Sequence, residues 1–358
     1  MSNNLNEKTS FTAGLGRREF ISMAAVTAAL GAIAPSFADD KNDKNDKMDA
    51  PIVTYKTLTQ SAAEAIVAAA KEAASKLESL VYKPAKTKMH IHVIGREGTL
   101  MAATQALGAW PGSDDIAARK ARTAWYFKLP TRVIGELSRS EMKAKGPLYG
   151  IEHSNAGLIT FPGGLPLITA DGELCGAIGV SGDAVDADEQ VASAGVEAFK
   201  QLKNAVVDIP SLSRAGADVI VAAAKAKAAQ VQSGVYNART KMHIHVIGVE
   251  CTILAASQAD NSWPGSDDIA TKKARTAWCF KLPTRTIGEL SRPEMAAKGP
   301  LYGIEFSNGG LISFPGGLPI MDAAGNCIGA IGVSGDVVDN DEEVAKAGVE
   351  AFQALIKK

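Results

Sequence analysis

The sequence has little of what marks several common classes of protein. It holds 38 Lys and Arg against 39 Asp and Glu, and no block of basic residues large enough to neutralise a run of phosphates. Nucleic acid is therefore not an expected partner. The four cysteines lack CxxC spacing, so they predict no cysteine-based metal site. The apolar run at 21–34 is shorter than the roughly 20 residues that cross a bilayer.

Motifs of several large enzyme classes are also missing. The sequence shows no nucleophile elbow, no P-loop, no dinucleotide fingerprint and no HExxH. Hydrolase, kinase and dehydrogenase chemistry therefore lack support. Glu152 and His153 are neighbours that can do acid–base work if the fold brings a substrate to them, so the question of enzymatic activity stays open.

The N-terminal segment has the features of an export signal. Arg17 and Arg18 precede the Ala-rich apolar run, and a small-x-small site ends at Ala38. Residues 1–38 therefore resemble a twin-arginine signal peptide, cleaved near Ala38, which predicts a periplasmic protein. The alternative is an uncleaved membrane anchor, but no stable membrane insertion is expected after processing. Residues 39–56 begin with a charged run without apolar periodicity and are predicted to be a linker.

The sequence repeats itself. The stretch KMHIHVIG at 88–95 returns at 241–248, an offset of 153 residues (243 − 90), and WPGSDDIA and GAIGVSGD recur at the same offset. A repeat this long is a domain, which predicts one domain at 57–206 and a second at 207–358. We expect the copies to pack as a pseudo-dimer that assembles further if another surface is available.

Apolar spacing and turn residues predict the elements of each copy. We expect helices at 61–80, 114–125 with Ser113 as N-cap, 136–143 and 187–202, with the first repeated at 213–231. Strands are predicted at 89–94, 99–104, 158–161, 165–169 and 175–181. The order predicts an α+β fold in which an antiparallel sheet of about five strands packs against helices.

Several ordered motifs carry a family resemblance. They are KARTA at 120–124, GIEHSN at 150–155, FPGG at 161–164 and GAIGVSG at 176–182. Together they resemble the GlcG/HbpS-like family of haem-binding or haem-degrading domains, over nearly all of both copies. The resemblance implies a profilin-like fold, assembly through dimers, and haem or iron binding. The sequence departs from the family pattern at Gly95 and Gly248, where the family usually has Asp.

Two His-x-His pairs are the first candidate site. His90 and His92 stand two residues apart on a predicted strand, so both rings lie on one face, and His243 with His245 repeats the arrangement. Imidazole is a common ligand of haem iron and of other transition metals, which makes the four histidines candidate metal ligands. The alternative is that they are hydrogen-bonded polar residues on a solvated face or at the domain interface.

His153 is the preferred single ligand. It precedes Phe161, Gly163 and Gly164, and glycine turns let backbone approach a flat ligand closely. The alternative is a turn histidine bonded to nearby backbone. The second copy has Phe306 at this position, which can stack on a tetrapyrrole but cannot ligate iron.

The helix at 114–125 and its repeat carry further candidates. Arg122 and Arg275 can bind porphyrin propionates or another carboxylate, and the neighbouring Thr123 and Thr276 can donate a hydrogen bond to a ligand. Ordinary surface helix charges are the alternative for both arginines.

Three functions follow from these residues. The first is a periplasmic protein that binds haem, or its iron, for sequestration, sensing or slow breakdown. The second is an accessory protein or enzyme for a small hydroxy- or oxo-carboxylate, with a non-haem transition-metal protein as a variant of the first. The third is a structural protein that docks a periplasmic partner.

Overall fold

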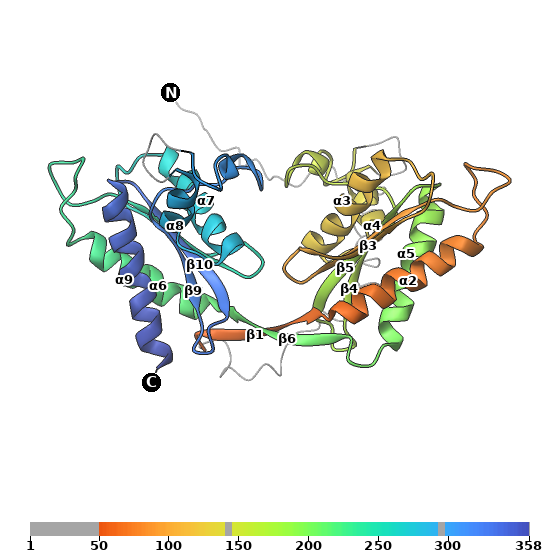
Figure 1. Cartoon of the computed structure of the whole chain (residues 1–358), viewed down its shortest axis with the longest axis horizontal. Coiled ribbons are helices and arrows are strands. Elements are labelled where there is room, and N and C mark those ends of the chain that lie inside the picture. The colour runs from red at the N-terminus through yellow and green to blue at the C-terminus, as the bar shows by residue number, and fades with distance from the viewer. Residues whose placement is uncertain (1–49, 140–144, 293–297, 358) are drawn as a thin grey trace, which may run out of the picture.

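A computed structural model describes residues 50–139, 145–292 and 298–357, and Figure 1 shows two similar domains joined by a two-stranded ribbon. The expected signal peptide lies outside the described residues, as does most of the charged segment after it. Within the described part of the chain, no helix combines the length and apolarity that crossing a membrane requires.

The first domain is an antiparallel sheet of four strands in the order β3-β2-β5-β4. Its elements are α2 (Gln60–Lys76), β2 (His90–Gly95), β3 (Leu100–Gln105), α3 (Gly112–Phe127), α4 (Thr131–Ser138), the short 3₁₀ helix η2 (Ile151–His153), β4 (Gly164–Ile168), β5 (Leu174–Ser181) and α5 (Val185–Gln201). The second domain has the same sheet order, β8-β7-β10-β9. Its elements are α6 (Arg214–Ala228), β7 (His243–Gly248), β8 (Ile253–Gln258), α7 (Gly265–Phe280), α8 (Thr284–Ser291), the 3₁₀ helix η3 (Ile304–Phe306), β9 (Gly317–Met321), β10 (Cys327–Ser334) and α9 (Val338–Ile356). The expected α+β fold is confirmed.

Each sheet is covered on both faces. In the first domain α2 and α5 pack together on one face, and α3 crosses the other face over β5. Side chains of β2 alternate accordingly: Met89, Ile91 and Val93 enter the core beneath α2 and α5, while Ile94 packs with Trp125 of α3. His90 and His92 share the phase of Ile94, so they lie under α3.

A ribbon of two strands connects the domains. Strand β1 (Ile52–Leu58) pairs antiparallel with β6 (Val206–Leu212), so each strand passes from one domain to the other (Figure 1). Tyr55 of β1 packs in the core beneath α7 of the second domain. Beside the ribbon, Arg96 Nε lies 2.6 Å from Glu250 Oε1, and its guanidinium stacks 4.2 Å from the centre of the Tyr55 ring. The two domains are thus joined by backbone pairing, apolar burial and an ion pair between the buried Arg96 and the partly exposed Glu250.

Several expectations about elements need correction. The predicted linker at 39–56 ends earlier, because β1 begins at Ile52. The segment 158–161 is not a strand: Ile159 N donates to Thr123 Oγ1 at 3.1 Å and Leu158 N donates to Glu152 O, so its amides are used outside a ladder. Each sheet therefore has four strands rather than about five.

Helix boundaries also differ in detail. Ser113 is not the N-cap of α3, because the helix already begins at Gly112, directly after Pro111. Ser113 is buried within the helix. Helix α4 begins at Thr131 directly after Pro130, whose fixed φ suits a helix start, and the end of the predicted 136–143 helix lies outside the described residues. Thr59 and Ser213, by contrast, accept from backbone N–H groups in the first turns of α2 and α6.

Candidate functional site

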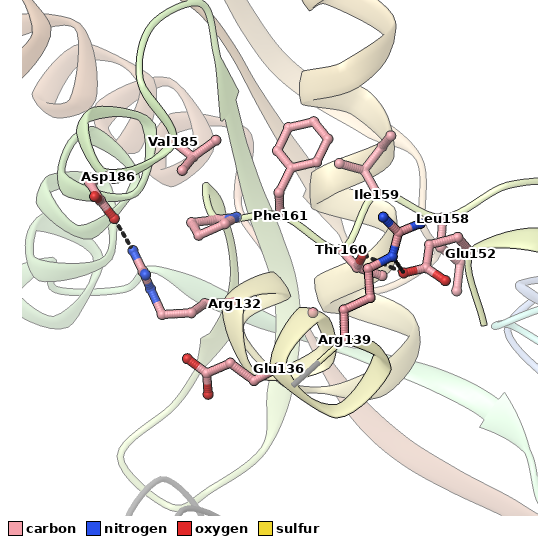
Figure 2. A pocket seen from close by; sticks show the side chains of 12 residues that line it. Arg132, Glu136, Arg139, Glu152, Leu158, Ile159, Thr160, Phe161, Val185 and Asp186 are labelled. Atoms are coloured by element: carbon pink, nitrogen blue, oxygen red, sulfur yellow. Dashed lines mark hydrogen bonds and ion pairs between the residues drawn. The ribbon is translucent and has the colours of Figure 1, made fainter. Parts of the chain in front are cut away.

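A pocket of about 660 Å³ opens in the first domain between α4, the segment 158–162 and the start of α5. Its apolar wall is formed by Leu158, Ile159, Phe161, Pro162 and Val185. Figure 2 shows Arg132 and Arg139 on the two sides of this wall, each directed toward a carboxylate. The volume falls in the range of ordinary ligand sites, and the lining combines an apolar surface with cationic groups at its edges.

The second domain repeats the pocket. A cavity of about 590 Å³ is lined there by Arg285, Arg292, Glu305, Phe314, Pro315 and Val338, among others. All six occupy the positions of first-domain lining residues at the offset of the repeat. The apolar wall and the two arginines are therefore features of the domain rather than of one copy.

The charged residues of the pocket are held in place. Arg132 Nε donates to Glu189 Oε2 at 2.6 Å and its guanidinium also meets Asp186, which raises the pKa of the arginine. Burial disfavours ionisation of Glu152, but hydrogen bonds from Ser138 (2.7 Å) and Thr160 (2.9 Å) outweigh it and lower the pKa of this carboxyl. The pocket therefore carries an ionised carboxylate and guanidinium groups together at neutral pH.

A buried ion pair supports the pocket from beneath. Lys120 Nζ donates to Asp188 Oδ2 at 2.7 Å and to Val180 O at 2.8 Å, and lies 4.7 Å from the centre of the Phe161 ring. Burial lowers the pKa of Lys120 and raises that of Asp188. The second domain repeats the pair with Lys273 and Asp341. The pair connects α3 to β5 and α5 next to Phe161.

The His-x-His pair of the first domain lies beneath the first turn of α3. His90 Nδ1 is 3.2 Å and His92 Nε2 is 2.8 Å from the same oxygen, Asp114 Oδ1. Both rings are buried, whereas Asp114 is exposed. The Nε2 atom of His90 has no hydrogen-bond partner in the described residues.

The second domain contains the matching cluster. His243 Nδ1 lies 3.4 Å and His245 Nε2 lies 3.1 Å from Asp267 Oδ1. Burial lowers the pKa of His245, with the nearby carboxylate of Asp267 acting against it. In each cluster the three ligand atoms lie within 4.8 Å of one another, the arrangement of two imidazoles and one carboxylate that suits a transition metal.

The remaining predicted site residues have mixed positions. Arg122 and Arg275 are exposed on α3 and α7 and do not line the pockets. Thr123 is buried, with its hydroxyl occupied by Ile159 N, and Thr276 accepts from Ile312 N in the same way. Both threonines therefore hold the pocket wall rather than facing the pocket.

The predicted glycines and turn residues lie next to pocket-lining residues in the sequence. A Cβ on Gly163 would come within 2.6 Å of Val180 O, and one on Gly164 within 2.4 Å of Lys120 O, so these glycines allow close strand–helix packing. Phe161 lines the pocket. His153 is exposed in η2 next to Glu152, and its counterpart Phe306 is 88% exposed in η3.

Residues that sequence reasoning missed complete both sites. Asp114 and Asp267 provide the carboxylate of each histidine cluster, and the signal available was their recurrence at the repeat offset. Arg132 and Arg139 flank the pocket, but only the fold shows that α4 faces the 158–162 segment.

All four cysteines are free thiols; burial raises the pKa of Cys175 to about 12.

These features define a tandem α+β protein whose two copies share a similar pocket and a similar histidine cluster. A family model described as "Haem degrading protein HbpS-like" matches residues 58–197 and again 212–350. The chain belongs to this HbpS-like family.

Individual relatives correspond to a single copy. A 15.0 kDa protein encoded in the dhaT-dhaS intergenic region of Citrobacter freundii is 31% identical over 140 residues, which is 39% of this chain and 95% of that protein. Among solved structures, the ORFY protein of Klebsiella pneumoniae is 28% identical, with a TM-score of 0.35 over 40% of this chain and 91% of that one. A PduOC–haem complex is 26% identical, with a TM-score of 0.34 over 40% of this chain and 94% of that one.

Proposed function

We propose that this protein binds haem, one molecule in each pocket that retains a suitable iron ligand. The observation that carries the proposal is the duplicated pocket, in which apolar side chains lie between two arginines. Membership of the HbpS-like family supports a tetrapyrrole as the occupant.

The pocket residues fit the two chemical parts of haem. Phe161, Pro162 and Val185 offer apolar surface to the macrocycle, and the side chain of Arg139, 59% exposed, is available to a propionate. None of the described lining residues is His, Cys or Met. His153, the exposed neighbour of the lining residue Glu152, would supply the iron ligand, which makes the first domain the stronger haem site.

The test is a haemin titration followed by the Soret band. Arg139→Ala removes a charge-assisted hydrogen bond to a propionate and is expected to weaken binding about 10-fold or more. His153→Phe gives the first domain the residue of the second and is expected to abolish the Soret signature of histidine ligation. The matched control is Phe306→Ala, which leaves that signature unchanged. Equal binding by wild type and His153→Phe would exclude His153 as the ligand.

A small hydroxy- or oxo-carboxylate is the second candidate occupant, and one observation favours it. Arg139 lies 4.0 Å from Glu152, so a ligand carboxylate can compete for the guanidinium without breaking a close ion pair. Thermal stabilisation by glycolate or an oxo-acid, lost in Arg139→Ala and without a haemin response, would favour this occupant over haem.

We infer that the protein works in the periplasm, as a haem-sequestering, haem-sensing or slowly haem-degrading protein. The inference is supported by the paired Arg17 and Arg18 ahead of an apolar run and by the small-x-small site at Ala38. Export is expected to yield a mature chain that begins at Asp39. Arg17→Lys with Arg18→Lys should retain the precursor in the cytoplasm, as measured by fractionation and intact mass; export of this variant at the wild-type level would contradict the twin-arginine route.

We also infer that one chain takes the place of a homodimer. The constant repeat offset and the antiparallel ribbon support this inference, because pairing Tyr55 with Ile209 and Lys56 with Asp208 is the register that two equivalent strands adopt about a two-fold axis.

A further inference from the structure

The histidine cluster of the second domain differs from that of the first in two hydroxyl groups. Ser262 Oγ lies 2.9 Å from His243 Nε2, and Thr271 Oγ1 lies 2.7 Å from His245 Nδ1. The first domain has alanine at both corresponding positions, Ala109 and Ala118. The hydroxyls contact the nitrogen of each ring that faces away from Asp267.

The direction of these two hydrogen bonds follows from proton counting. A hydroxyl has one hydrogen, and Ser262 donates its hydrogen to Ala259 O at 2.8 Å. Thr271 donates its hydrogen to the backbone carbonyl of Asp267 at 3.2 Å. With its hydrogen on the carbonyl, each hydroxyl oxygen accepts from the imidazole, which corresponds to the tautomers with His243 protonated at Nε2 and His245 protonated at Nδ1.

In these tautomers the remaining ring nitrogens carry lone pairs, and both face the same carboxylate. His243 Nδ1 is 3.4 Å and His245 Nε2 is 3.1 Å from Asp267 Oδ1, and His243 Nδ1 has no hydrogen-bond partner in the described residues. Two nitrogen lone pairs directed at a carboxylate oxygen are repelled by its negative charge unless a cation lies between the three atoms. The side chains of His243 and His245 are only 2% and 6% exposed, so water cannot surround them.

We propose that His243, His245 and Asp267 form a binding site for a divalent first-row transition metal, with Ser262 and Thr271 fixing the histidine tautomers. Ligand atoms about 2.1 Å from one metal are separated by roughly 3.0–3.4 Å in octahedral or tetrahedral geometry, which matches the two measured separations. Hydrogen bonds to the distal ring nitrogens are the usual second layer of such sites. The exposed side of Asp267 leaves coordination positions open to water.

The first domain forms a weaker version of the same site. His90, His92 and Asp114 supply the ligand atoms, but no hydroxyl corresponding to Ser262 or Thr271 orients the rings. Loss of such a hydrogen bond typically lowers metal affinity about 10–100-fold. The two domains are therefore expected to bind the metal with unequal affinities.

The test uses the mature full-length chain, stripped with a chelator and free of haem. Zn²⁺ is titrated by calorimetry, and Co²⁺ is added in parallel so that its visible absorption reports nitrogen coordination. We expect a tight site and a second site about 10–100-fold weaker. Asp267→Asn should remove the tight site, while Asp268→Asn, the adjacent carboxylate paired with Lys272, is the matched control and should leave it unchanged.

The tautomer argument has its own variants. Ser262→Ala with Thr271→Ala converts the second cluster to the residues of the first and should make the two affinities similar. Ala109→Ser with Ala118→Thr should strengthen the first site. The proposal is overturned if the variant Ser262→Ala with Thr271→Ala keeps the tight site unchanged. It is also overturned if neither Zn²⁺ nor Co²⁺ binds the wild-type protein. In that second case ¹⁵N spectra should show imidazolium rings paired with Asp267. Haemin binding by Asp267→Asn should remain as in wild type, so the haem proposal fails or stands separately.

Discussion

At the scale of single residues, the pocket depends on a carboxylate that stays ionised inside the protein. Glu152 accepts hydrogen bonds from Ser138 and Thr160, and the same residue lines the pocket beside Arg139. The second domain keeps the arrangement with Glu305 and Ser313. These hydrogen bonds hold the segment that carries Phe161 at a fixed distance from α4.

A pH-dependent effect on stability follows from this carboxylate. Because the pKa of Glu152 is lower in the folded protein than its usual 4.5, its ionised form stabilises the fold above that pH, and the contribution is lost as pH falls through the folded-state pKa. Glu152→Gln should therefore lower the free energy of unfolding by about 1 kcal/mol at pH 7. The gap should narrow as pH falls below 4.5 and close once pH is below the folded-state pKa of Glu152.

Urea denaturation at several pH values measures this effect. Glu136→Gln is the matched control, since Glu136 lines the same pocket with an exposed side chain. A Glu152→Gln deficit that does not diminish as pH falls through the folded-state pKa of Glu152 would show that the carboxyl acts through shape rather than charge.

At the scale of elements, the sequence predicted what local periodicity can predict. Helices α2, α3 and α5 and strands β2, β4 and β5 lie within a few residues of their expected bounds, because each has an apolar face of the right period. Strands β1 and β6 were missed, although Ile52, Val53 and Thr54 favour a strand, since β1 pairs with a segment some 150 residues away. The predicted strand at 158–161 is apolar enough for a strand, but its amides bind side chain and turn oxygens instead.

The candidate sites were predictable to a similar degree. Strand periodicity placed His90 and His92 on one face, but the third group, Asp114, comes from a helix whose docking over β2 depends on the tertiary fold. The pocket arginines carry no sequence signal of their own. They line the pocket only because the fold places α4 opposite the segment that contains Phe161 and Pro162.

The elements that join the domains give a second prediction. Arg96 follows β2 and Glu250 follows β7, and their ion pair bridges the two sheets beside the ribbon. Glu250→Gln leaves a buried guanidinium without its closest countercharge and should cost about 1–3 kcal/mol. Amide exchange should quicken in β1 and β6.

The control for this prediction is provided by the repeat. Glu97→Gln alters the residue at the equivalent position of the first copy and should leave exchange in the ribbon unchanged. Equal effects of the two substitutions would indicate that the Arg96–Glu250 contact does not hold the domains together.

At the scale of the whole molecule, the ribbon decides how the domains can exist apart. A fragment of residues 205–358 contains β6 but lacks β1, so it exposes an unpaired strand edge. We expect two fragments to pair through β6 and to elute as a dimer in light-scattering chromatography, whereas the full chain pairs its β6 with its own β1. A monomeric fragment as stable as the full chain would contradict the view that one chain replaces a homodimer.

The alanines at 109 and 118 opposite Ser262 and Thr271 have a wider meaning. In an assembly of identical subunits, every substitution appears in all binding sites at once, so a trade-off between tight retention and ready release is settled once for all of them. A chain that encodes both halves separately can change one half alone. Unequal clusters in a single polypeptide would let one site remain filled while its neighbour exchanges its ion with the surroundings, whereas two identical and independent sites fill and empty together.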